Sequence, residues 1–263
     1  MASSKTAGEI LETVIEDGEK ELERANAGLA FSGFAAGLNL SFGVIAMAVV
    51  GAMTGGIGLT AMLVYPIGFL IVILGRAQLF TENTVTPVTV VLTQHNQLPN
   101  MLRMWTVIFI SNLLGTLVFA AVVVYGGVLE GFPLDLLLKE ADHLLGYGFW
   151  TVGIKAVFGG WLVALIAWLV ASSRDTISQI FFIYVIAFLI PAAGLAHSIA
   201  GSSEILMSVF AGNTSFLEYL GGFLLPTTLG NIIGGVVLVT LLNFGQVIGS
   251  KPKSMKEKLR ESK

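Results

Sequence analysis

Six long apolar runs divide the chain. They extend over residues 30–53, 57–92, 104–127, 149–171, 177–211 and 221–249. Each is long enough to cross the hydrocarbon core of a bilayer, which takes about 20 residues of helix. The pattern predicts an all-α membrane protein with six transmembrane helices, which together form a single transmembrane domain over residues 29–249.

The second and fifth runs are longer than one span needs, and both are interrupted by polar or helix-breaking residues. In the second run the interruption is 75–84, with Pro87 following, and in the fifth it extends from Pro191 to Glu204. Non-helical backbone at membrane depth is tolerated only where it is buried in protein or lines a cavity. We therefore expect spans 2 and 5 to be broken helices, with the functional site at the two breaks.

The two ends of the chain are polar. Residues 1–28 place apolar side chains at helical spacing among charged ones, which predicts an amphipathic helix at the membrane surface or against the helix bundle. A solvated N-terminal helix is the alternative. Residues 250–263 form a basic tail. If both termini are cytoplasmic, 11 of the 14 Lys and Arg residues lie on that side and only Lys139 lies outside, in an external loop over 128–147.

The chain matches itself weakly at an offset of about 120 residues. Because each half, about 29–127 and 149–249, holds three spans, the second half would be inverted in the membrane. Inverted repeats place a transport path at the repeat interface, near the bilayer midplane. Chance similarity between apolar segments is the alternative. The matching pairs are 33–36 with 153–156, 112–118 with 231–237, and the breaks 80–81 with 197–198.

Composition excludes several functional classes. Hydrophobic residues make up 55% of the chain and charged residues only 12%, whereas a soluble domain carries about 25% charged residues. An ordinary soluble enzyme or a nucleic-acid-binding protein is therefore excluded. The chain has no Cys, its three His lie in different segments, and no phosphate-binding loop is present. We predict no enzymatic activity, no cofactor and no metal site.

Ionisable residues inside the spans require a structural or functional explanation, because inserting each one into the membrane costs about 2.5 to 3.5 kcal/mol on insertion scales. Arg76, Glu82 and Lys155 either form a structural ion-pair set at the first break or contact a substrate. His197 either exchanges a proton with a transported weak acid or is a neutral core residue with both ring nitrogens bonded. Glu204, at the end of the second break, needs a reason as well.

Four short segments of the chain form a recognisable set: Ser32–Gly37, Leu79-Phe80-Thr81 with Asn83, Trp161-Leu162-Val163 and His197-Ser198-Ile199-Ala200. Together they resemble the formate/nitrite transporter family, and the similarity extends over about residues 10–250. The resemblance implies an aquaporin-like fold, a homo-pentamer with one pore per protomer, and passage of small monovalent anions such as formate, nitrite or hydrosulfide.

By resemblance, His197 is the pore histidine and Thr81 faces it. Lys155, six residues before Trp161, resembles a family lysine that would attract the anion. Three positions depart from the family pattern and indicate a divergent branch: Gln78 and Glu82 flank Leu-Phe-Thr where an acidic and a small residue are usual, and Gly160 replaces an Asn. The implied hydrophobic constrictions are Tyr65, Phe69, Leu79, Phe80, Val163 and Ile190.

These observations predict a channel or transporter in a bacterial or archaeal cytoplasmic (inner) membrane. Its partners would be the lipid bilayer and a small weak-acid anion or its neutral acid, with the anion protonated near the pore histidine, and no nucleic acid. Two alternatives stay open. An aquaporin-type channel for small neutral solutes would want paired Asn-Pro-Ala turns, and neither break has one. The other alternative is a non-conducting membrane protein.

Overall fold

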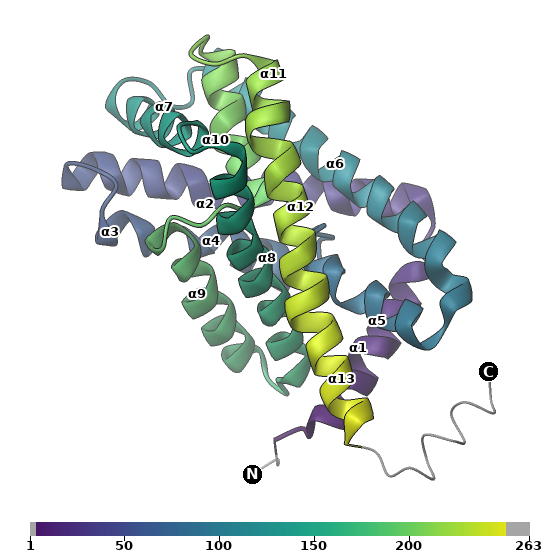
Figure 1. The fold of residues 1–263 in the computed structure, drawn as a ribbon. Helices are drawn as coiled ribbons and strands as arrows, with labels where there is room; N and C mark the ends of the chain where they lie inside the picture. The colour runs from purple at the N-terminus through teal and green to yellow at the C-terminus, as the bar shows by residue number, and fades with distance from the viewer. Residues whose placement is uncertain (1–3, 251–263) are drawn as a thin grey trace.

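The computed structural model describes residues 4–250, and all the regular structure within them is helical (Figure 1). The predicted basic tail lies outside the described residues except for Ser250. The α-helices are α1 (Ala7–Leu22), α2 (Asn26–Thr54), α3 (Leu59–Met62), α4 (Pro66–Leu74), α5 (Thr86–Thr93), α6 (Leu98–Tyr125), α7 (Phe132–Leu145), α8 (Phe149–Ser172), α9 (Thr176–Ala192), α10 (Ser198–Phe210), α11 (Phe216–Glu218), α12 (Leu225–Ile233) and α13 (Leu242–Gly249). Short 3-10 turns, η1 (Glu82–Thr84) and η2 (His95–Gln97), and π-helical segments, η3 (Tyr219–Leu224) and η4 (Gly234–Leu241), complete them.

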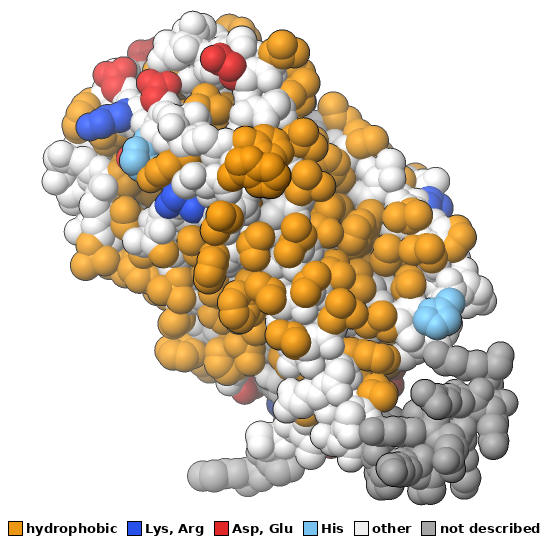
Figure 2. Space-filling model, viewed as in Figure 1, with side chains coloured by type: hydrophobic (Ala, Val, Ile, Leu, Met, Phe, Trp, Pro, Cys, Tyr) orange, Lys and Arg blue, Asp and Glu red, His pale blue; other side chains and the backbone are white. Residues whose placement is uncertain are grey.

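Four helical stretches in the described part of the chain are long and apolar enough to cross a membrane: Asn26–Thr54, His95–Tyr125, Phe149–Ser172 and Phe216–Gly249. The other apolar helices are shorter, at Leu59–Leu74, Thr176–Ala192 and Ser198–Phe210. Figure 2 shows hydrophobic side chains covering the molecule over α12 and the helices beside it, with charged side chains gathered near one end. Such an apolar surface is typical of a protein whose solvent is lipid.

Two helix pairs approach closely through glycine. At Gly37 on α2, a Cβ atom would collide with the backbone of Asn112 on α6, and at Gly234 in η4 it would collide with the backbone of Val157 on α8. Small residues at such positions let helix backbones come together in a membrane, where no hydrophobic force drives association. The α2–α6 and α8–η4 contacts are thus fixed by the glycine spacing of the sequence.

Helices α1 and α13 lie at one end of the molecule, and α7 and α11 lie at the opposite end (Figure 1). Helix α1 begins with a capping box, in which Thr6 and Glu9 exchange hydrogen bonds. It buries Leu11 and Val14 and packs against α5, α8 and α13. Its apolar stripe therefore faces the rest of the bundle.

The segment 128–147, interpreted above as an external loop, contains helix α7. The loop interpretation overlooked an amphipathic pattern: Leu137 and Ala141 lie four residues apart and both are buried. Pro133 lies at the first helical positions, where its fixed φ suits the helix and its missing N–H costs nothing. The helix packs across α2 and α10.

Helix α9, like α1, begins with a side-chain N-cap. The carboxylate of Asp175 accepts a hydrogen bond from the backbone N–H of Ser178 at 2.9 Å, which is the N-cap interaction. This bond holds the pKa of Asp175 below its usual value. The turn thereby separates α8 from α9.

Candidate substrate pathway

Two non-helical segments enter the core, one over residues 75–81 after α4 and one over residues 193–197 after α9. The buried side chain of Asn112, on α6, holds the first. Its Oδ1 atom accepts from the N–H of Phe80 at 2.9 Å, and its Nδ2 atom donates to the carbonyl oxygens of Gly33 at 2.7 Å and Gln78 at 2.9 Å. One side chain therefore joins α2, α6 and the first segment.

Asn231, on α12, holds the second segment in the same way. Its Oδ1 accepts from the N–H of Ser198 at 2.8 Å, and its Nδ2 donates to the carbonyl oxygens of Ala156 at 2.7 Å and Ala196 at 3.1 Å. These bonds make Ser198 the counterpart of Phe80. The repeat alignment of the sequence pairs Phe80 with His197 instead, so the two correspondences differ by one residue. Neither Asn was predicted as a site residue. The sequence feature that could have identified them is the internal repeat, which aligns Asn112 with Asn231.

His197 joins the two segments. Its Nε2 lies 2.7 Å from the Oγ1 of Thr81, and its Nδ1 accepts from the N–H of Ala200 at 3.1 Å, which caps α10. A ring nitrogen that accepts a hydrogen bond carries no proton, so the neutral ring is protonated on Nε2 and donates to the Thr81 hydroxyl oxygen. Both side chains are buried, with exposed fractions of 2% for His197 and 0% for Thr81. Both ring nitrogens are thus hydrogen-bonded, as expected for the neutral alternative.

Apolar side chains surround this contact. The ring of Phe69 meets the imidazole of His197 edge-on, with centroids 5.3 Å apart, and Tyr65 lies 5.8 Å from Phe69. The other expected constriction residues in the same apolar cluster are Leu79, Val163 and Ile190. Phe80 is the exception, because it belongs to a different apolar cluster.

The side chain of Phe80 packs against α6 instead. Its ring lies 4.8 Å from that of Phe109 and 5.5 Å from that of Trp105. The backbone N–H of Phe80 is held by Asn112. Adjacent side chains of this segment therefore contact different parts of the protein. Phe80 packs the segment against α6, and Thr81 contacts His197.

Two cavities approach the contact from opposite sides. The α7 cavity has a volume of about 70 Å³, and its lining includes Tyr65, Glu140, His143, Tyr147, Ile190, Gly194, His197 and Glu204. The α1 cavity has a volume of about 280 Å³, and its lining includes Lys5, Asp17, Lys20, Glu21, Ile73, Arg76, Gln78, Glu82 and Asn83. His197 closes the first, and the short stretch between Gln78 and Asn83, which contains Thr81, borders the second.

The charged residues of the predicted ion-pair set are divided between these cavities. Lys155 donates to the carbonyl oxygen of Gly194 at 2.9 Å and lies 4.5 Å from the centre of the Tyr147 ring, at the α7 cavity. Arg76 and Glu82 line the α1 cavity. Among residues 4–250 the recorded ion pairs are Lys20–Asp17 and Arg24–Glu21. Neither pair includes Arg76, Glu82 or Lys155, so the ion-pair alternative is not formed as a direct contact among these residues. Lys155 lies at the α7 cavity, whereas Arg76 and Glu82 share the α1 cavity.

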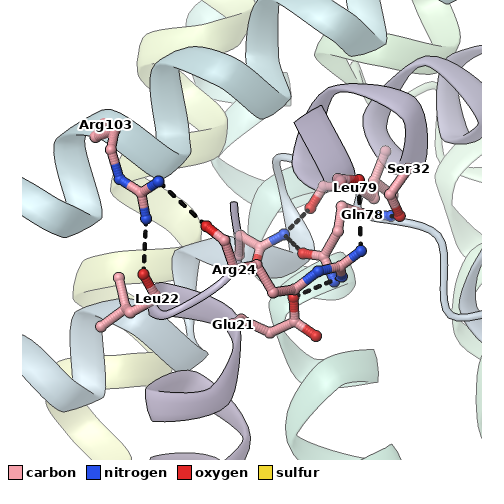
Figure 3. A network of polar contacts seen from close by, with 9 residues as sticks. Glu21, Leu22, Arg24, Ser32, Gln78, Leu79 and Arg103 are labelled. Atoms are coloured by element: carbon pink, nitrogen blue, oxygen red, sulfur yellow. Dashed lines mark hydrogen bonds and ion pairs between the residues drawn. The ribbon is translucent and has the colours of Figure 1, made fainter. Parts of the chain in front are cut away.

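The chain between α1 and α2 is anchored beside the first segment (Figure 3). The guanidinium of Arg103, on α6, donates to the carbonyl oxygens of Leu22 at 2.7 Å and Arg24 at 3.2 Å. The N–H of Gln78 donates to the Oγ of Ser32 at 3.1 Å. Arg103 thus holds the end of α1 to α6, and Ser32 holds the start of α2 to the first segment, whose Gln78 lines the α1 cavity.

The family model for "Formate/nitrite transporter" matches residues 8–245. The chain belongs to the formate/nitrite transporter family. This is a family of transporters rather than enzymes, and the chain is an integral membrane protein. The resemblance carried by the four short segments is confirmed.

Named relatives span most of the chain. Inner membrane protein YfdC of Escherichia coli (strain K12) is 32% identical over 258 residues, which cover 96% of this chain and 82% of that protein. A probable formate transporter of Methanothermobacter thermautotrophicus is 30% identical over 80% of this chain and 85% of that one. The solved structure described as a pentameric formate channel with formate bound has a TM-score of 0.73 at 19% identity, covering 86% of this chain and 98% of that chain. This last similarity establishes the shared fold.

Proposed function

We propose that this protein is a channel or transporter for small monovalent weak-acid anions of the formate, nitrite or hydrosulfide class. The observation that carries the proposal is the buried contact of 2.7 Å between His197 and Thr81, where two non-helical segments meet between two cavities. Backbone of this kind is tolerated at membrane depth where it lines a pathway. Family membership and a relative named as a probable formate transporter support the same class of substrate.

The proposed pathway runs from the α7 cavity to the α1 cavity. Lys155, at the edge of the α7 cavity, attracts the anion. Tyr65, Phe69, Leu79, Val163 and Ile190 then form the apolar barrier around His197 and Thr81, with Phe80 behind the first segment. A bare charge meets a high barrier in such surroundings, so the anion crosses as its neutral acid, sharing a proton beside His197.

The proposed architecture is six spans in two inverted repeats. The second span combines the short helices on either side of the first segment, and the fifth combines α9 and α10. The matching hydrogen bonds of Asn112 and Asn231 support the repeat, because each side chain joins the same kinds of partner in its own half. The pentameric state of the solved formate channel supports a homo-pentamer with one pathway per protomer.

Both termini are proposed to face the cytoplasm. The chain has no Cys, so single cysteines can be introduced without a background. Cysteine at Asp135, exposed on α7, should react in intact cells with an impermeant thiol reagent, whereas cysteine at Glu12, exposed on α1, should react only after lysis. The reverse labelling pattern would overturn the orientation.

The transport proposal is tested by flux into proteoliposomes. Formate, nitrite and hydrosulfide should enter protein-containing vesicles faster than protein-free ones, and more so as the external pH falls, since the neutral acid becomes more abundant. Glycerol should enter both kinds of vesicle at the same rate. Glycerol flux without anion flux would favour the aquaporin-type alternative, and no flux of any solute would favour a non-conducting protein.

A further inference from the structure

The same kind of turn ends the helix before each non-helical segment. In both turns one backbone N–H donates to the carbonyl oxygen three residues earlier, and the next N–H donates to the one five residues earlier, which is the Schellman motif. The donors are Arg76 (3.2 Å) and Ala77 (3.0 Å) after α4, and Gly194 (3.0 Å) and Leu195 (2.8 Å) after α9. Arg76 and Gly194 therefore occupy equivalent positions in the two halves of the chain.

Arginine is an unusual residue for this position. The φ of Arg76 is 56°, close to the 58° of Gly194, and Arg76 is the only non-glycine residue with a positive φ in the described chain, 4–250. Glycine is usual there because a side chain makes the left-handed conformation costly. Backbone strain of this kind persists mainly where the residue has a function. The turn itself would form more easily with glycine, so the arginine side chain requires an explanation.

The second half of the chain places a cation at the equivalent turn by another route. Lys155, on α8, donates to the carbonyl oxygen of Gly194 at 2.9 Å. The hydrogen bonds of the two buried asparagines pair Gly33 with Ala156, a register three residues from that of the sequence alignment. In this register the counterpart of Lys155 is Ser32, which is uncharged. The first half thus carries its cation on the turn, and the second half carries it beside the turn.

The guanidinium of Arg76 lines the α1 cavity and has no hydrogen-bond or ion-pair partner among residues 4–250. The other cations that line this cavity are engaged: Lys20 forms an ion pair with a carboxylate of α1 at 3.7 Å, and Lys5 donates to the carbonyl oxygen of Ala171 at 2.6 Å. Glu82 lines the cavity too, without an ion pair to Arg76. Since a guanidinium stays protonated in proteins, Arg76 presents an unpaired positive charge to this cavity.

We propose that Arg76 binds the permeant anion at the α1 side of the pathway, as Lys155 does at the α7 side. The inference rests on the proposed function and adds a second anion site to it. The planar guanidinium offers two parallel N–H groups that match the two oxygens of a carboxylate such as formate. The anion thus meets a cation at either end of the pathway, on both sides of the His197–Thr81 contact.

Two structural roles for Arg76 are the alternatives. One is interaction with the negative end of the α4 dipole, and the other is neutralisation of Glu82 across the cavity. The first predicts a lower melting temperature for Arg76→Gln. The second predicts that Glu82→Gln restores transport to Arg76→Gln. An anion-binding role predicts neither result.

Formate uptake measured from each side separately tests the site. Right-side-out and inside-out membrane vesicles expose different cavities, and the thiol labelling described above identifies which cavity faces the medium. We expect Arg76→Gln to raise the KM for formate entering from the α1 side by about tenfold. The maximal rate and the KM from the α7 side should stay unchanged, because lost attraction lowers occupancy only below saturation.

Two further substitutions separate the charge of Arg76 from its backbone. Arg76→Lys keeps the charge and should keep the wild-type KM from the α1 side. Arg76→Gly removes the charge and relieves the left-handed turn. It should therefore raise this KM as Arg76→Gln does, while melting no lower than the wild type.

Arg174→Gln is the matched control. Arg174 is exposed beside Ser173, which lines the α1 cavity, but it lies outside the lining itself, so loss of its charge should leave both KM values unchanged. Size-exclusion profile and melting temperature show whether each variant assembles. An unchanged KM in assembled Arg76→Gln, an equal rise from both sides, or restoration by Glu82→Gln would overturn the inference. A wild-type protein that takes up no formate from either side would overturn the proposed function itself.

Discussion

Replacement of His197 by asparagine should lower formate flux by at least about tenfold while the protein still assembles. Asparagine is a good N-cap residue, so it can accept from the N–H of Ala200 as Nδ1 of His197 does. It has no proton to exchange near neutral pH. Since each 1.4 kcal/mol added to a barrier slows passage tenfold, even a small part of the cost of moving an anion past Phe69 gives this effect.

His197→Phe and Thr81→Val complete the test. Phenylalanine removes both hydrogen bonds of the ring, so it should abolish formate flux and also lower the melting temperature, because α10 loses its cap. Valine at 81 removes only the contact with Nε2 and should give an intermediate flux. Flux is measured in proteoliposomes over a range of external pH. Unchanged, pH-independent flux in assembled His197→Asn would leave His197 as a core residue without a role in transport.

The parts of the site that could be predicted from the sequence are those that depend on residue type along the chain. Apolar runs revealed membrane helices, and polar interruptions at 75–84 and 191–204 revealed where helices end before the core. Thr81 and His197 were paired by resemblance to a family, and the structure brings them within 2.7 Å. Hydrophobic periodicity alone contains no information on contacts between residues 116 positions apart.

The remaining features depend on side-chain direction and on distant partners. Phe80 and Thr81 are adjacent, yet one packs on α6 and the other meets His197. Lys155 was grouped with Arg76 and Glu82 because all three lie in spans. Only the fold shows that Arg76 and Glu82 line the α1 cavity while Lys155 contacts Gly194 and Tyr147 at the edge of the α7 cavity. Helix α7 was overlooked because the charged residues of this segment between two spans were interpreted as a loop, and the helical spacing of its apolar residues was not considered.

Asn231→Leu should destabilise the protein more than His197→Phe or Thr81→Val does. Leucine has a similar size to asparagine, but it leaves the buried N–H of Ser198 without its acceptor and removes a donor from the carbonyl oxygen of Ala196. Each buried polar group left unpaired costs about 1–3 kcal/mol, so we expect a loss of about 3 kcal/mol or more. Because Ser198 follows His197 directly, the His197–Thr81 contact should be disturbed and formate flux lost.

The melting temperature of the purified protein and formate flux measure this effect, and Asn243→Leu is the matched control. Asn243 lies in α13 and donates to the carbonyl oxygen of Val239 four residues earlier, at 2.9 Å, in a half-buried position. Water can replace that bond, so the control should melt near the wild-type temperature and transport normally. If Asn231→Leu melts like Asn243→Leu, the second segment is held by its apolar packing, and the shared hydrogen bonds of Asn112 and Asn231 do not position the pathway. A strong loss at Asn231 together with a comparable loss at Asn112→Leu would instead show that both halves of the chain hold their segments by the same device.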